Sequence, residues 1–440
     1  MSESTPNASF EGPVGADPAL TLRRSIGIGA TLLTIMTMIA NVTNYASSLI
    51  FSRLLEPVGY GELITLLALA LVIAIPSGAA QTVIAERVAF YRAEGERNSL
   101  FYLIRHAIVH VTAIAAAITV IYTAVTPLLA ELLNLQDIGP AIALAPLIFL
   151  TFVLPVALGV AQGMDRFLAL GSILVTIALS RIIFGVAGSI VDGSAGAVIA
   201  GQAIGMFVVL GISAWMLRDL VFPRGSGAAR SGLEPKPELR VGMASAAFIA
   251  FAVLSNLDIL LAKIFMSGID VGMYAAIATV GKIVLFASMA VPFVMVPHAA
   301  REHREHGASG RSLRISGLIV LAISLVVAVP AAIAPDQVVK LMFGSDYAAA
   351  APGVRPILVA GAGLALLYLV AVYSATIKDR RWFILLLVGV ALQIIGISLF
   401  HSSPVQVATV QAAVIVVVLL LNEHLFHSII WPWGGRRIST

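Results

Sequence analysis

Long apolar segments separated by short polar ones run through almost the whole chain. A transmembrane helix needs about 20 consecutive apolar residues, and twelve segments reach that length. Their approximate bounds are 25–51, 60–86, 100–126, 140–163, 168–191, 195–217, 241–264, 272–297, 313–334, 352–377, 382–401 and 405–427. The pattern predicts an all-α polytopic membrane protein with about twelve transmembrane helices.

The two halves of this pattern resemble each other in direct order. Val58-Gly59 precedes Val271-Gly272 by 213 positions, and Asp165-Arg166 precedes Asp379-Arg380 by 214. Several prolines recur at similar offsets. Because each half holds an even number of spans, the repeat is parallel, related by an axis along the membrane normal. Two six-helix lobes of this kind are typical of secondary transporters, which bind substrate between their repeats.

Polar segments divide the chain into five parts. Residues 1–22 are predicted as a disordered cytosolic tail, 23–217 as an N-lobe with spans 1–6, and 218–240 as a cytosolic linker. Residues 241–428 form the predicted C-lobe with spans 7–12, followed by a cytosolic tail at 429–440. The linker is rich in Gly, Pro and Ser, as flexible connections are.

Composition supports lipid as the surrounding solvent. Hydrophobic residues make up 59% of the chain and charged residues 11%, whereas soluble proteins have about 25% charged residues. Cysteine is absent, which excludes disulfides and thiolate metal sites. The net charge of +4 is spread over the loops between spans, so nucleic acid is not expected as a partner.

The basic residues lie mostly on one side of the predicted membrane. Twenty Lys and Arg residues fall in the tails and in every second loop, against two to four in the opposite loops. The positive-inside rule therefore places both termini in the cytosol, and the expected location is the cell inner (plasma) membrane.

Three segments resemble a known family. They are SSLIFSRLLEPVGYGELITLLAL at spans 1 and 2, NLDILLAKIFMSGIDVGMYAAIATVGKIV at 256–284, and PDQVVKLMFGSDY at 335–347. These phrases resemble the bacterial polysaccharide and oligosaccharide flippases of the multidrug/oligosaccharidyl-lipid/polysaccharide exporter superfamily. The resemblance implies a monomeric transporter that moves a polyprenyl-diphosphate-linked oligosaccharide (an O-antigen, capsule or exopolysaccharide unit) by alternating access. It implies lipid-linked glycan, membrane lipids and other glycan-export proteins as partners.

Charged residues inside apolar spans are the candidate binding groups, because a charge at the centre of a membrane helix costs about 2.5–3.5 kcal/mol on insertion scales. Arg181 lies near the middle of span 5 and favours a cationic cavity for an anionic substrate, with a structural pair as the alternative. Arg53 ends span 1, where the family has a recurrent arginine. It can clamp a diphosphate, or extend to the interface or to Glu56.

Span 7 and span 8 carry two opposite charges, Asp258 and Lys282. Either they neutralise each other, or Lys282 faces the substrate phosphate while Asp258 titrates or holds a coupling cation. Asn44 and Asn256 occupy corresponding positions of spans 1 and 7. Their amides suit sugar hydroxyls, although hydrogen bonds between helices are the commoner use.

Two other function classes stay open. A multidrug or toxin exporter of the same superfamily is the nearest alternative. Cationic drugs favour acidic cavities, however, and the charges inside these spans are mostly basic, with Arg181 and Lys282 against Asp258. A glycan polymerase or ligase needs an acid/base group on a large outer loop, and the predicted outer loops are short. No nucleotide-binding, metal-ligand or nucleophile motif occurs, so neither catalysis, a cofactor nor a metal is expected.

Overall fold

The computed structural model describes residues 18–221, 243–292, 295–296, 298–299, 302, 310–377 and 381–426. Residues 1–17 of the predicted N-terminal tail, the whole predicted C-terminal tail and most of the predicted linker lie outside these residues. The described chain is helical, with these elements: α1 Pro18–Leu54, α2 Pro57–Ala93, α3 Arg97–Leu132, α4 Gly139–Gly163, α5 Phe167–Asp192, α6 Ala195–Met216, α7 Arg218–Val221, α8 Met243–Leu254, α9 Leu257–Phe265, α10 Gly268–Ala287, α12 Arg311–Ile333, α13 Pro335–Met342, the 3-10 helix η1 Ser345–Gly353, α14 Val354–Ile377, α15 Arg381–Leu399 and α16 Pro404–Phe426.

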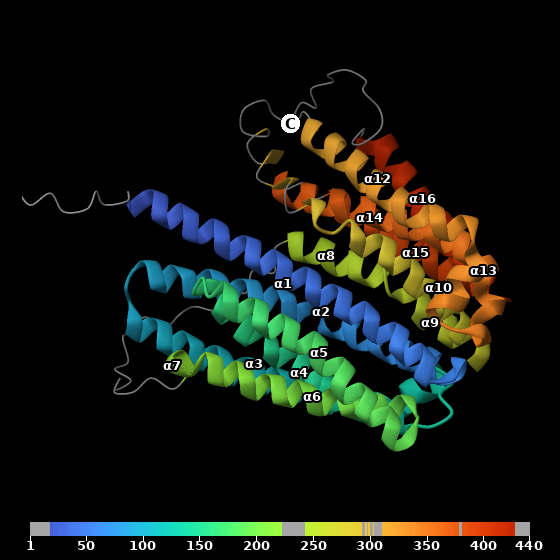
Figure 1. Ribbon diagram of the computed structural model, residues 1–440, viewed down its shortest axis with the longest axis horizontal. Helices are drawn as coiled ribbons and strands as arrows, with labels where there is room; N and C mark the ends of the chain where they lie inside the picture. Colours follow the sequence, from blue (N-terminus) through green and yellow to red (C-terminus); the bar gives the residue numbers. More distant parts are fainter. Residues whose placement is uncertain are drawn as a thin grey trace, which may run out of the picture.

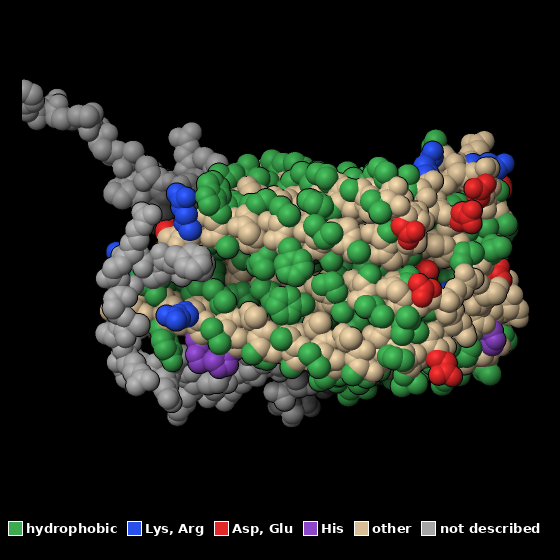
Figure 2. Space-filling model, turned by 90° about the horizontal axis from the view of Figure 1, so that it is seen from below, with side chains coloured by type: hydrophobic (Ala, Val, Ile, Leu, Met, Phe, Trp, Pro, Cys, Tyr) green, Lys and Arg blue, Asp and Glu red, His purple; other side chains and the backbone are tan. Residues whose placement is uncertain are grey.

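The predicted spans are present as helices. Within the described residues, eleven helical segments are long and apolar enough to cross a membrane, and the 37-residue α1 covers the remaining predicted span. Figure 2 shows an apolar band around the middle of the molecule, with charged side chains gathered at its two ends. Such a band is what hydrocarbon requires of the surface that it contacts. The protein is therefore a multi-pass membrane protein.

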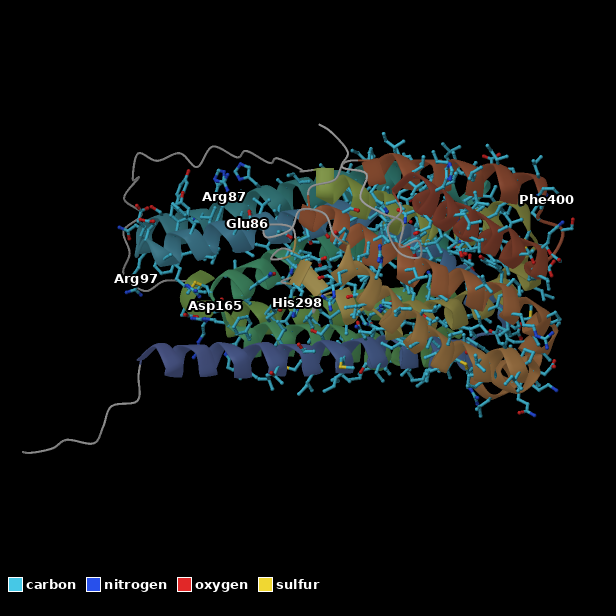
Figure 3. All side chains as sticks on the ribbon, turned by 90° about the horizontal axis from the view of Figure 1, so that it is seen from above. Glu86, Arg87, Arg97, Asp165, His298 and Phe400 are labelled. Carbon is cyan, nitrogen blue, oxygen red and sulfur yellow. The ribbon has the colours of Figure 1, made fainter. Side chains whose placement is uncertain are left out.

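The helices form two lobes, the N-lobe from α1 to α7 and the C-lobe from α8 to α16 (Figure 1). The lobes lie close together where α1 ends and α13 lies, and separate toward the end where α1 begins and α7 lies. We call these the α13 end and the α7 end. Figure 3 places Arg87, Arg97 and Asp165 at the α7 end, opposite Phe400. The predicted two-lobed all-α fold is confirmed.

Local chemistry sets several helix boundaries. Pro57 opens α2 and Pro335 opens α13, because proline suits the first turn, where no N–H donor is required. Gly193 ends α5 with a φ of 63°, a left-handed conformation that glycine adopts without strain. Ser194 then caps α6 by accepting a hydrogen bond from the Ala197 N–H at 3.1 Å.

Some boundaries differ from the predicted ones. α1 begins at Pro18, before the predicted N-lobe boundary at 23, and the predicted linker starts with the helical turn α7. The predicted seventh span is broken into α8 and α9 around Ser255 and Asn256. α10 ends at Ala287, and a turn follows ahead of Pro292, since a proline lacks the N–H for a helical hydrogen bond and its ring clashes with the carbonyl four residues earlier.

Glycines bring the two lobes together at the α13 end, where α2 packs on α10. A Cβ atom on Gly272 would lie 1.9 Å from the Pro57 carbonyl oxygen, and one on Gly61 would lie 2.7 Å from the Gly272 nitrogen. Small residues of this kind let membrane helices approach backbone to backbone. The close approach therefore depends on the absence of side chains at these two positions.

Ion pairs tie the N-lobe together at the α7 end. Arg92 pairs with Asp165, and Arg166 forms a two-pronged pair with Asp219 of α7, with one N···O distance of 2.9 Å. The hydrogen bonds from Arg166 lower the pKa of the Asp219 carboxyl below its ordinary value. These side chains are a third to a half exposed, so each pair stabilises the fold by about 1 kcal/mol at most.

Candidate functional site

Arg181 and Asn44 meet inside the N-lobe. The Arg181 guanidinium donates a hydrogen bond of 3.1 Å to the Asn44 side-chain oxygen, and both side chains are half-buried. The contact joins α5 to α1, two helices that pack along much of their length. An amide oxygen carries no charge, so the arginine keeps a positive charge that this partner does not neutralise.

Lys282 and Asn256 form the corresponding contact of the C-lobe. The Lys282 ammonium donates a hydrogen bond of 2.9 Å to the Asn256 side-chain oxygen. Asn256 sits at the break between α8 and α9, where its amide nitrogen donates to the Ala252 carbonyl oxygen at 2.8 Å. That bond satisfies a carbonyl that the interrupted helix leaves without its usual partner. The break thus fixes the amide oxygen in the direction of Lys282.

The two cation–amide pairs lie at similar depth. Counted from the helix ends at the α13 end, Asn44, Arg181, Asn256 and Lys282 are 10, 11, 9 and 14 residues into their helices. At 1.5 Å per residue this is about 14–21 Å along the helix axis, near the middle of a hydrocarbon core about 30 Å thick.

An aromatic contact joins the lobes next to both pairs. Tyr45, the neighbour of Asn44, packs on Phe286 of α10 with ring centroids 5.3 Å apart. Phe286 follows Lys282 by four positions, so the two side chains lie on the same face of α10. Asn44, which bonds Arg181, and Lys282 are therefore carried by the two helices that meet at this contact, α1 and α10.

Asp258 is buried in the first turn of α9, with 4% of its surface exposed. One carboxylate oxygen accepts a hydrogen bond of 2.7 Å from the Tyr274 hydroxyl. The other, Oδ1, is buried without a hydrogen-bond partner among the described residues. Asp258 and Lys282, both described, do not form a direct ion pair, since the lysine bonds Asn256. Their opposite charges are nevertheless close enough to interact. A buried carboxylate with a vacant oxygen can take up a proton or a cation.

Arg53 lies outside this central group, at the α13 end. Its exposed guanidinium donates to the Leu341 carbonyl oxygen, and its Nε to that of Met342 at 3.4 Å. These are the last carbonyls of α13, which have no partner within the helix and which attract a cation through the helix dipole. Arg53 thus joins the N-lobe to the C-lobe, and is separate from Arg181 and Lys282.

Further contacts at the α13 end connect the lobes. The Tyr60 and Thr279 hydroxyls are 3.1 Å apart, and the Tyr347 hydroxyl donates to the Ser52 carbonyl oxygen at 3.1 Å. Tyr60 and Tyr347 pack edge to face, with ring centroids 5.9 Å apart. These bonds join segments far apart in the chain, and the sequence carries no local signal for them.

Two charged residues near this contact were not predicted as site residues. Glu62 of α2 has a buried carboxylate oxygen without a hydrogen-bond partner among the described residues, and Lys263 of α9 is 4% exposed. Lys263 lies near the end of the predicted seventh span, where a lysine side chain commonly extends to the interface. Burying a charged residue this deeply costs free energy unless an opposite charge or hydrogen bonds compensate it. The burial of Lys263 could not be predicted, because in the sequence it only lies near a span end.

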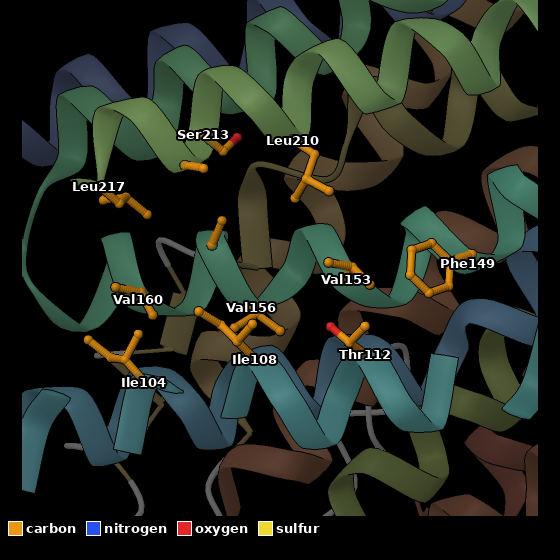
Figure 4. A pocket seen from close by; sticks show the side chains of 12 residues that line it. Ile104, Ile108, Thr112, Phe149, Val153, Val156, Val160, Leu210, Ser213 and Leu217 are labelled. Atoms are coloured by element: carbon orange, nitrogen blue, oxygen red, sulfur yellow. The ribbon is translucent and has the colours of Figure 1, made fainter. Parts of the chain in front are cut away.

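A separate cavity lies within the N-lobe, between α3, α4 and α6 (Figure 4). Its volume is about 260 Å³, and its walls are almost entirely apolar. The lining residues are Ile104, Ile108, Thr112, Phe149, Val153, Val156, Ala157, Val160, Leu210, Ser213, Ala214 and Leu217. It contains none of the predicted site residues. Among the described residues, no group of three or more His, Cys, Asp or Glu is arranged to hold a metal ion.

Comparisons with known proteins find similarity in structure alone. No protein-family model matches the chain, and no curated protein matches it in sequence. An inward-facing multidrug-resistance MATE transporter of the MOP superfamily aligns with a TM-score of 0.70 and 12% identity, over 90% of this chain and 98% of that one. The lipid II flippase MurJ in an inward closed conformation aligns with a TM-score of 0.71 and 11% identity, over 91% of this chain and 88% of that one.

A third solved structure has a lower TM-score. An outward-facing MATE transporter of the MOP superfamily aligns with a TM-score of 0.58 and 14% identity, over 90% of this chain and 94% of that one. The chain is thus a multi-pass membrane protein with the two-lobed fold of the transporters and flippases of the MOP superfamily.

Proposed function

We propose that this protein is a flippase that moves a polyprenyl-diphosphate-linked oligosaccharide across the inner membrane by alternating access. In this proposal the α7 end is cytosolic, as the distribution of Lys and Arg predicts. The sugar head group travels between the lobes while the polyprenyl chain stays in lipid. The chain acts without a cofactor and performs no covalent chemistry.

One observation carries the proposal, the pair of mid-membrane cations. Arg181 and Lys282 come from different lobes, lie at similar depth, and are each bonded to an asparagine oxygen rather than to a carboxylate. A diphosphate is a stronger acceptor than an amide oxygen and forms charge-assisted hydrogen bonds with both side chains. When it binds, the Asn44 and Asn256 amides are released and become available to sugar hydroxyls.

The arrangement of the lobes corresponds to a state that accepts substrate from the cytosol. The contacts among Arg53, Tyr60, Thr279, Tyr347 and the carbonyls of α13 close the α13 end. Export requires these contacts to break while the lobes approach at the α7 end. Arg53 is then released from α13 and can bind the diphosphate as the substrate leaves. In this proposal Arg53 contacts α13 in the present conformation and takes its predicted role as a diphosphate ligand after the lobes have moved.

Binding tests this proposal directly. A short-chain polyprenyl diphosphate should stabilise the purified protein against heating, and the Arg181→Gln/Lys282→Gln variant should lose most of this shift. Arg355→Gln serves as a control, because Arg355 is exposed and donates to the Ala332 carbonyl oxygen away from the central pairs. Stabilisation by cationic dyes, with none by the diphosphate, would instead favour a multidrug exporter.

Asp258 is the proposed coupling group. Asp258→Asn keeps the size of the side chain and an oxygen for Tyr274 to donate to, but it removes the charge and the site of protonation. We expect the variant to bind the diphosphate normally while transport driven by an ion gradient falls at least tenfold.

The measurement is glycan-lipid translocation in proteoliposomes with and without an imposed proton or sodium gradient. Asp270→Asn is the matched control, since Asp270 is a carboxylate of the neighbouring helix α10 that accepts a hydrogen bond from Ser267. Unchanged gradient dependence in Asp258→Asn would rule out the coupling role.

A further inference from the structure

The apolar cavity between α3, α4 and α6 lies within the N-lobe, apart from the residues that join the two lobes. Its almost entirely apolar walls distinguish it from the central polar pairs. Of the two hydroxyl groups on its walls, that of Ser213 already donates to the Val209 carbonyl oxygen at 2.8 Å. The walls therefore offer little to a polar ligand, and a hydrocarbon chain is the chemical match.

The shape of the cavity is that of a groove along the helices. In Figure 4, Ile104, Val160 and Leu217 lie at one end and Phe149 at the other. The first three belong to the α7-end halves of α3, α4 and α6, and Phe149 lies deeper in the bilayer. Its volume of about 260 Å³ is below the range of about 300–1,000 Å³ that drug-sized ligands need, but suits part of one extended chain.

Two arginines stand at the α7 end of the groove. Arg105 precedes Ile108 and Thr112 by three and seven positions, which places it on the helix face that lines the groove. Arg218 follows Leu217 at the start of α7, and α7 packs against α3. Both side chains are exposed, so both are accessible to a lipid head group.

Trp215 marks this level as the membrane interface. Its ring is exposed on α6, and the Arg218 guanidinium lies 5.4 Å from the ring centroid. Tryptophan is enriched where the hydrocarbon meets the head groups. A guanidinium stacked on an aromatic face keeps its edge donors available to a phosphate. Nearby Asp219 forms its ion pair with Arg166, and its charge also interacts with that of Arg218.

We propose that this groove binds an anionic phospholipid, with one acyl chain between α3, α4 and α6 and the phosphate at Arg105 and Arg218. The groove lies on helices at the far side of the N-lobe from the C-lobe (Figure 1). A substrate held by Arg181 and Lys282 between the lobes is therefore not the occupant, and the groove is a second lipid site. The acyl chain in this groove contacts both α3 and α6, which lie on either side of α4.

Native mass spectrometry of the full-length protein with equal amounts of phosphatidylglycerol and phosphatidylcholine tests the proposal. We expect at least a fivefold preference for phosphatidylglycerol in the wild type, and none in Arg105→Gln/Arg218→Gln. Arg97→Gln/Arg311→Gln removes the same charge from exposed positions at starts of α3 and α12, and should keep the preference. Ala157→Phe fills the groove and should lower binding of both lipids.

Three results would overturn the proposal. The first is a wild type without preference, and the second is a preference that survives in Arg105→Gln/Arg218→Gln. The third is displacement of phosphatidylglycerol by polyprenyl phosphate in the wild type, which would assign the groove to the carrier lipid. Unfolding temperatures of the variants, measured in the same detergent, show whether a loss of binding reflects loss of the fold.

Discussion

Arg181→Gln/Lys282→Gln should abolish glycan export in cells that depend on this protein, with a loss of at least a hundredfold. Each glutamine keeps a hydrogen-bonding side chain but removes the charge that attracts the diphosphate. A charge-assisted hydrogen bond contributes roughly 1.5–3 kcal/mol, and two such losses account for a fall of this size. The single variants should each retain part of the activity.

The measurement is the surface glycan of cells that carry each variant in place of the wild-type gene. Arg355→Gln should support normal export, because its side chain lies outside the central pairs. Asn44→Asp would add a carboxylate beside Arg181 and neutralise it, so this variant should fail although no cation is removed. Normal export by the double variant would show that the cations serve packing alone.

The second large effect is expected at the glycine contact between the lobes. In Gly272→Ala the new methyl group would lie 1.9 Å from the Pro57 carbonyl oxygen, so α2 and α10 must separate at the α13 end. Overpacking costs about 1–3 kcal/mol, and each 1–2 kcal/mol changes an equilibrium by a factor of about 5–30. The protein should then stay open at the α13 end and transport should fall at least tenfold.

Labelling of a single cysteine measures this opening. The chain has no native cysteine, and Ser52 is 2% exposed at the α13 end, so Ser52→Cys reports on the contact. A membrane-impermeant maleimide should label it slowly in the wild-type background and several times faster with Gly272→Ala. Gly78→Ala is the matched control, since a Cβ atom there meets nothing within 4 Å. Equal labelling rates in all three backgrounds would contradict this role of the glycines.

The sequence predicted the architecture because each membrane span carries its own signal. An apolar segment of span length is helical in lipid whatever its neighbours are, so spans could be placed one at a time. The repeat then indicated two lobes. Arg181 and Lys282 were recognised by the same local reasoning, since a charge in the middle of an apolar span is costly wherever the helix packs.

The partners of these charges could not be predicted, because they depend on how the helices are packed. The opposite charges of Asp258 and Lys282 interact, but the hydrogen bonds of these side chains go to Tyr274 and Asn256, which the sequence did not indicate. The break between α8 and α9 decides this, and no glycine or proline marks it in the sequence. Arg53 likewise reaches carbonyls almost three hundred positions away, at Leu341 and Met342.

Translocation in proteoliposomes tests the central claim most directly. Purified protein is reconstituted with a fluorescent polyprenyl-diphosphate oligosaccharide, and transfer between leaflets is followed by accessibility of the sugar to a soluble quencher. The account predicts rapid transfer by the wild type, and a rate near that of empty liposomes for Arg181→Gln/Lys282→Gln. Transport of cationic drugs by the same liposomes, without transfer of the lipid-linked sugar, would contradict it.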